Sequence, residues 1–235
     1  MIRCSACVAF VSALAGVAAP SLADIVVARH IANGRGLSIQ AFLDGQLHQV
    51  FAGQLIHELQ SGTGVAAQLE GVRNLYCMEV DQFVSDINRV FNVDPLDELP
   101  LPESGPLFDA RAGAVASLFK SAAGLEEADD AANEFAAAFA IAIWEMVYDY
   151  DPNVIDGNID LSSGRFRVLR NGSPISGSTL INFNSLITEA GENISKNGVY
   201  TLSNDAAQDL IVRIPTPGST SLLAFGGLVL TRRKR

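Results

Sequence analysis

Apolar and polar residues alternate over short runs in the first and last thirds of the chain, a period typical of half-buried β-strands. The predicted strands are 25–28, 37–43, 49–56, 75–80, 164–169, 199–202 and 209–214. Asn33-Gly34 and Asp44-Gly45 separate the early runs. They predict turns, because Asn, Asp and Gly tolerate the backbone torsions that turns require.

The middle third has a different pattern. Prolines are frequent between residues 95 and 106, and they predict a surface loop because proline lacks a backbone donor. Two Ala-rich helices are predicted at 109–122 and 130–148, with Asp130 as N-cap of the second and Asp151-Pro152 as its end. The second helix is expected to be buried on most sides, because it is small or apolar almost all round. A short helix at 180–190 is also compatible with the sequence.

These elements predict an α+β architecture. A β-rich body is built from the N- and C-terminal thirds, and the two Ala-rich helices are inserted between them. Residues 24–213 are about 190 in number, which is enough for a single compact domain with a hydrophobic core.

The N-terminus has the features of a secretory signal peptide. Arg3 precedes an apolar stretch at 8–19, and the small-residue pattern Ser21-Leu22-Ala23 follows. We therefore expect residues 1–23 to direct Sec-type export and cleavage to occur between Ala23 and Asp24. The alternative is a buried N-terminal helix.

The C-terminus combines three parts: a Pro-x-Pro motif, an uncharged apolar segment at 219–231 and a basic end. The motif and the basic end comprise Pro215, Thr216, Pro217, Gly218, Arg232, Arg233, Lys234 and Arg235. The apolar segment is shorter than the roughly 20 residues of a full transmembrane span, which suits a temporary anchor with the basic end on the cytoplasmic side. The alternatives are a permanent tail anchor, or a last strand followed by a solvated basic end.

This tail, residues 214–235, resembles the PEP-CTERM sorting signals of exosortase substrates in Gram-negative bacteria. Thr216 stands where that family usually has Glu. The resemblance implies an exosortase-like processing enzyme as a partner. It also implies transient anchoring in the inner membrane before release to the cell surface or the extracellular space.

The net charge and the cysteine content argue against some classes of partner and of covalent link. Without the two ends, 11 of the 16 basic residues remain against all 26 acidic ones, so the net charge is near −15. Such a surface disfavours nucleic acid and anionic membranes as partners. Cys77 is the single cysteine of this part, which excludes an intramolecular disulfide.

Most catalytic and metal-binding motifs are incomplete. His57-Glu58 is followed by Ser61 in place of the second histidine of a zinc protease, and Gly62-Thr63-Gly64 lacks the lysine of a phosphate-binding loop. The acidic segment 149–160 does not have EF-hand spacing, although an irregular calcium site remains open there. No cofactor is predicted.

Residues 74–81 and 135–149 together resemble the Cys-Gln thioester-type domain of bacterial surface proteins. There a Tyr-Cys-apolar-acid strand meets a helix with the pattern Ala-Ala-Phe-Gln-x-Ala-Ile-Trp-Glu, and the resemblance implies an internal thioester that acylates an amine or hydroxyl group. Here Ala140 occupies the glutamine position, so the acyl donor for Cys77 is missing. The spacing favours no substitute among Gln54, Gln68 and Gln82.

Several residues of these segments have simpler interpretations. Cys77 is expected to be a small buried residue, and Trp144 and Tyr148 are expected to belong to the core. Glu79 and Glu145 either lie close enough to bind a cation or raise one another's pKa, or are exposed to solvent.

The sequence therefore predicts a non-enzymatic, exported protein of the cell surface or extracellular matrix, with an inactive thioester-like domain that binds, for example, surface polysaccharide or matrix. One alternative is a covalent adhesin that uses Cys77. The other is a secreted acidic hydrolase.

Overall fold

The computed structural model describes residues 24–96, 100–101, 105–106, 109–154, 158–190 and 198–214. The predicted signal peptide with Ala23, and the sorting motif from Pro215 to Arg235, lie outside the described residues. Asp24 is the first residue described. Its carbonyl accepts the Val93 N–H at 2.7 Å, and its carboxylate accepts the Val65 N–H at 3.0 Å.

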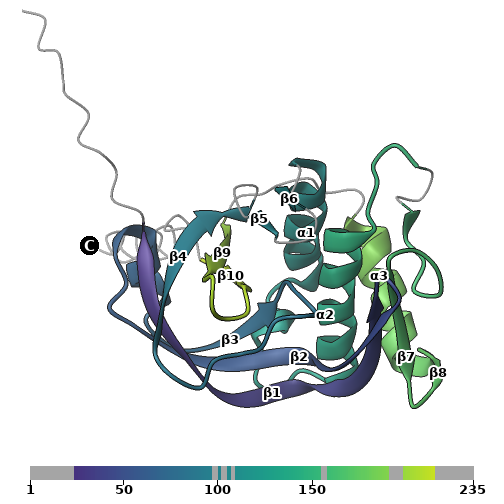
Figure 1. Cartoon of the computed structure of the whole chain (residues 1–235), viewed down its shortest axis with the longest axis horizontal. Helices are drawn as coiled ribbons and strands as arrows, with labels where there is room; N and C mark the ends of the chain where they lie inside the picture. Colours follow the sequence, from purple (N-terminus) through teal and green to yellow (C-terminus); the bar gives the residue numbers. More distant parts are fainter. Residues whose placement is uncertain are drawn as a thin grey trace, which may run out of the picture.

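Eight antiparallel strands form the main sheet, in the order β2-β3-β10-β9-β4-β1-β7-β8 (Figure 1). The strands are β1 (Ile25–Leu43), β2 (Gln46–Gln60), β3 (Gly71–Cys77), β4 (Arg89–Pro95), β7 (Phe166–Arg170), β8 (Ser173–Pro174), β9 (Val199–Ser203) and β10 (Leu210–Arg213). A separate pair consists of β5 (Pro100–Leu101) and β6 (Gly105–Pro106).

The long strand β1 closes part of this sheet into a ring. It pairs with β2 along nearly all of its length, while residues 25–28 also pair with β4 and residues 40–43 with β7. Because β2 continues through β3, β10 and β9 back to β4, six strands form a closed circuit. β7 and β8 extend the sheet beyond it.

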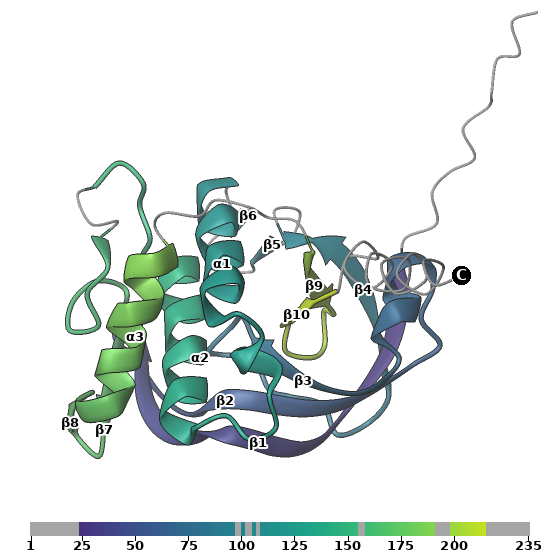
Figure 2. The ribbon, with the colours of Figure 1, turned by 180° about the vertical axis from the view of Figure 1, so that it is seen from behind.

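Three helices stand side by side at one end of the sheet (Figures 1 and 2). They are α1 (Asp109–Ala122), α2 (Asn133–Tyr148) and α3 (Gly177–Ala190), and two short 3₁₀ turns span η1 (Gly64–Leu69) and η3 (Leu125–Glu127). α2 packs against α1, α3 and strands β1 and β2. All of its residues from Ala136 to Tyr148 are buried, which confirms the prediction from its apolar composition.

The α+β class and the β-rich body are confirmed. Two local predictions were wrong. Asn33-Gly34 is not a turn, because β1 runs through it with irregular pairing between Asn33 and Gly36. Asp130 does not cap α2, which begins at Asn133 after Ala132 and has no side-chain cap.

The sequence also misplaced or missed some elements. The strand predicted at 75–80 ends at Cys77, where pairing with β10 stops. β4 was missed, although Phe91 and Val93 are buried and alternate with exposed Val90 and Asn92. The third helix, α3, is longer than the segment proposed for it.

Candidate functional site

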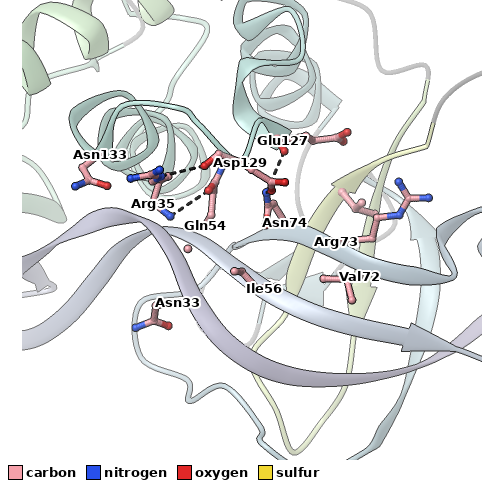
Figure 3. A pocket seen from close by; sticks show the side chains of 12 residues that line it. Asn33, Arg35, Gln54, Ile56, Val72, Arg73, Asn74, Glu127, Asp129 and Asn133 are labelled. Carbon is pink, nitrogen blue, oxygen red and sulfur yellow. Dashed lines mark hydrogen bonds between the residues drawn. The ribbon is translucent and has the colours of Figure 1, made fainter.

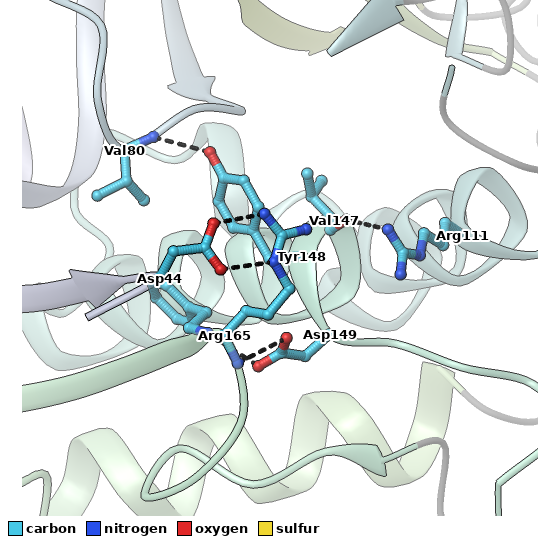
Figure 4. A network of polar contacts seen from close by, with 8 residues as sticks. Asp44, Val80, Arg111, Val147, Tyr148, Asp149 and Arg165 are labelled. Carbon is cyan, nitrogen blue, oxygen red and sulfur yellow. Dashed lines mark hydrogen bonds and ion pairs between the residues drawn. The ribbon is translucent and has the colours of Figure 1, made fainter. Parts of the chain in front are cut away.

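Cys77 lies at the end of β3, between β10 and α2. On one side Cys77 pairs with Leu210 of β10. On the other, the Tyr76 ring meets the Phe139 ring edge to face at 4.8 Å, and the Trp144 side chain contacts the Cys77 thiol. One turn further along α2, the Tyr148 hydroxyl accepts the Val80 N–H at 3.1 Å (Figure 4). The segment from Tyr76 to Val80 therefore runs along α2.

Ala140 lies on the same face of α2 as Trp144. It precedes Trp144 by four residues, so the two share one helix face, and both are fully buried. The structure thus brings together the two segments singled out in the sequence. Ala140, the residue expected at the glutamine position, has a methyl side chain and is buried.

The three glutamines considered as substitutes differ in their surroundings. The Gln54 amide donates to the carbonyls of Glu126 and Ala128, both at 2.9 Å, and Gln68 is exposed on η1. Gln82 lines the same cavity as Cys77. Of these three, Gln82 alone is brought to the Cys77 site.

Sequence reasoning missed the place of Gln208 at this site. It lines the Cys77 cavity and donates from its amide to the Glu79 carbonyl at 2.7 Å. Its backbone N–H donates to the Phe83 carbonyl. The pairing of β10 with β3 brings it here.

The thiol of Cys77 is held in its protonated form. Only 3% of the residue is exposed, and burial raises its pKa to about 12, assisted by the Glu79 charge and opposed by the Trp144 contact. Since the thiolate is the nucleophilic form of cysteine, burial disfavours the reactive form of Cys77 at neutral pH.

A cavity of about 390 Å³ reaches Cys77 and Trp144 from the surface. Val50, Phe51 and Leu55 form part of its apolar wall, while Glu79 and Asp81 add carboxylates. Phe83, which is 87% exposed, and Leu47 also line the cavity. A cavity of this size and composition suits a small, partly apolar group bound without covalent chemistry.

Two buried carboxylates at the end of α2 hold the segment before β7. Glu145 accepts the Asp160 N–H at 2.9 Å. Asp149, one turn later, accepts the N–H groups of Arg165 at 3.1 Å and Phe166 at 2.9 Å (Figure 4). Burial raises the pKa of Glu145 to about 8, and the nearby charges of Asp149 and Asp160 act in the same direction.

Two further contacts fasten this end of the helices (Figure 4). Arg111 of α1 donates to the carbonyls of Val147 at 2.9 Å and Tyr150 at 3.0 Å, which satisfies acceptors at the end of α2. Arg165 forms a two-pronged ion pair with Asp44, at 2.6 and 2.8 Å.

These contacts bear on two hypotheses about acidic residues. Glu79 and Glu145 are both buried, which excludes the alternative that they are exposed to solvent. Nor does the described part of 149–160 assemble a calcium site. Asp149 is occupied by backbone N–H groups, and Asp160 accepts the N–H of Ser162. Among the described residues, no three His, Cys, Asp or Glu side chains are grouped to hold a metal ion.

Within the part of the chain that the structure describes, no helix has the length and apolar character needed to cross a membrane. Comparison with models of known protein families, with curated proteins and with solved structures finds no match to this chain.

Proposed function

We propose that this protein is exported, sorted to the cell surface or extracellular matrix by an exosortase-like system, and binds its partner there without covalent or enzymatic chemistry. One observation carries the proposed role of the domain. Cys77 lies against the helix that a thioester domain would use, with Ala140 in place of the acyl donor.

The chemistry of the site supports a binding role. A buried thiol with a pKa near 12 is a poor nucleophile, and the Gln208 amide is committed to the Glu79 carbonyl. What remains is a cavity with an exposed aromatic residue at its edge, and exposed aromatic residues are frequent anchors of binding surfaces.

The proposed export and sorting rest on the two ends of the sequence. The first 23 residues have the arrangement of a signal peptide, and the last 22 combine Pro215-Thr216-Pro217, an apolar segment and four basic residues. The strongly acidic surface of the part between them suits an extracellular, soluble domain.

Intact mass and thiol alkylation of the purified domain 24–214 test the non-covalent role. We expect the full mass, no alkylation of Cys77 in the native state, and one alkylated thiol after unfolding, with Cys77→Ser as the control that abolishes labelling. A loss of about 17 Da, the ammonia released when a Cys-Gln thioester forms, would overturn the proposal.

The covalent adhesin is kept as a second candidate because Gln82 lines the Cys77 cavity. If the mass loss occurs and Gln82→Ala restores the full mass, the adhesin is correct and the non-covalent role is wrong. If the native domain has the full mass, the adhesin is excluded.

The C-terminal peptide of the native protein tests the sorting route. We expect surface-exposed or released material to lack Arg235 and the apolar segment before it. Intact Arg235 on surface-exposed protein would exclude exosortase-like processing.

A further inference from the structure

An open groove of about 780 Å³ lies between the middle of the β1–β2 hairpin and the turn that joins α1 to α2 (Figure 3). Its wall on the hairpin side includes Asn33, Gly34 and Arg35, and its opposite wall includes Glu127, Asp129 and Asn133. It is separate from the cavity over Cys77, with which it shares only Asn33.

The groove is built on the irregular part of β1. Pairing with β2 shifts between Asn33 and Gly36, and the backbone of Gly36 crosses that of Gly53 so closely that a Cβ on either would collide with the other strand. Such bulges redirect side chains and are frequent beside binding sites. Here the bulge carries Arg35 towards the α1–α2 turn, where its Nε donates to the Asp129 carbonyl at 3.0 Å.

The opposite wall is held in place by two amides that also line the groove, the buried Gln54 and the half-buried Asn74. The Gln54 amide donates to the Glu126 and Ala128 carbonyls. The Asn74 amide donates to the Glu127 carbonyl at 3.0 Å and to the Asp129 carboxylate at 2.9 Å (Figure 3). The polar rim is therefore positioned before any ligand arrives, and pre-organisation reduces the entropy lost on binding.

The chemistry of the lining is polar but balanced in charge. Two arginines, Arg35 and Arg73, and two acids, Glu127 and Asp129, line the groove, so its formal charges cancel. The Arg73 guanidinium donates to the Leu69 and Gln68 carbonyls, and three asparagines add amide donors and acceptors to the lining. Its aliphatic part consists of Ile56, Val72 and Val212, of which Val72 is 63% exposed.

We propose that this groove binds a neutral oligosaccharide; the inference rests on the proposed surface-binding role and names its ligand class. Sugar hydroxyls both donate and accept hydrogen bonds, which matches a rim of amides, guanidinium groups and carboxylates. The C–H faces of sugar rings match the aliphatic side chains. The volume falls within the range of roughly 300–1,000 Å³ that holds small-molecule ligands.

Other ligand classes fit less well. A phosphate or an acidic polymer is best bound by an excess of arginine, whereas here the arginines are matched by carboxylates and the protein is acidic overall. A divalent cation requires converging oxygen ligands, and the described residues contain no group of three acidic or histidine side chains that would hold one.

Titration calorimetry and NMR shift mapping of domain 24–214 test the inference. The probes are the neutral hexasaccharides of maltose, cellulose and xylan type, with an alginate hexasaccharide as the anionic comparison. We expect at least one neutral probe to bind and to shift resonances of groove residues. We expect the alginate probe not to bind.

Asn33→Ala and Asn133→Ala are the test variants, because both side chains are exposed at the rim. Each is expected to weaken binding about fivefold, the loss that corresponds to one hydrogen bond of roughly 1 kcal/mol. Asn184→Ala, at an exposed asparagine on α3, is the matched control and is expected to leave affinity unchanged.

Absence of binding by all three neutral probes to the folded domain overturns the inference. So does tighter binding of alginate, or neutral binding that neither rim variant weakens. These outcomes leave the mass and C-terminal peptide results unaffected. A retained Arg235 would exclude the sorting route without changing the binding measurements, so the two failures are distinguishable.

Discussion

The cavity over Cys77 and the groove at Asn33–Arg35 are built from the same hairpin but in opposite ways. Residues at the floor of the cavity, Cys77 and Trp144, are buried in the core beside α2. The groove has exposed residues of the β1 bulge on one wall, and its other wall, the α1–α2 turn, is held by the amides of Gln54 and Asn74. We therefore expect changes at the cavity floor to lower the stability of the fold, and changes at the groove rim to affect only the proposed ligand binding.

The largest effect is expected at the cavity floor. Trp144→Ala should lower the free energy of unfolding by about 3–5 kcal/mol, because it removes a fully buried indole and leaves a void. Urea denaturation measures this loss. The control is Phe83→Ala, which removes an exposed aromatic residue from the same cavity and should change stability by less than about 0.5 kcal/mol. An equal loss of unfolding free energy in the two variants would contradict the expected difference between the buried and the exposed residue of the cavity.

The next largest effect is expected where α2 meets the segment before β7. Asp149→Ala should cost about 2–4 kcal/mol, because the N–H groups of Arg165 and Phe166 lose their acceptor. The matched control, Asp151→Ala, removes an exposed carboxylate that bonds only within its own turn, to Asn153, and should cost less than about 1 kcal/mol. Thermal unfolding of both variants measures and compares these losses of stability.

A pH-dependent effect, smaller per pH unit than the preceding ones, is expected at Glu145. Its pKa is raised from 4.5 to about 8 in the folded protein, so between these values the native state retains a proton that the unfolded chain releases. The contribution of Glu145 to stability should therefore be largest below this range and be lost as pH rises towards 8, with a slope of at most about 1.4 kcal/mol per pH unit.

Glu145→Gln should remove this slope, because glutamine still accepts the Asp160 N–H but does not ionise. Asp209, whose pKa is raised to about 6, contributes a slope of the same sign at lower pH, so the comparison is made between pH 6 and 8. Glu134→Gln, at the other end of α2, is the control. An unchanged slope in Glu145→Gln would show that Glu145 is ionised in the native state at neutral pH.

The smallest effect is expected at the groove rim. Asn33→Ala and Asn133→Ala should each change the free energy of unfolding by less than about 0.5 kcal/mol, because both side chains are exposed. Chemical denaturation of the two variants checks this. A loss above 1 kcal/mol would show that the rim is part of the folding scaffold and would remove the contrast with the cavity.

Local patterns were enough to predict most of the regular structure. Alternation located β2, β7 and β9, and the apolar run after Phe135 correctly indicated a buried α2. The local patterns failed where tertiary contacts override the local backbone preference. Asn33-Gly34 favours a turn in isolation, but β2 pairs across it and keeps β1 continuous. Asp130 favours a cap, but the chain there is held by contacts with Arg35 and Asn74.

By itself, the sequence determined the class of the fold and the burial of α2, because each follows from residue type and local spacing. The tertiary structure alone decided the closure of six strands into a ring, the place of Gln208 beside Cys77 and the groove opposite the α1–α2 turn. Each of these depends on strand pairing or packing between residues far apart in the chain, and such contacts leave no periodic trace in the sequence.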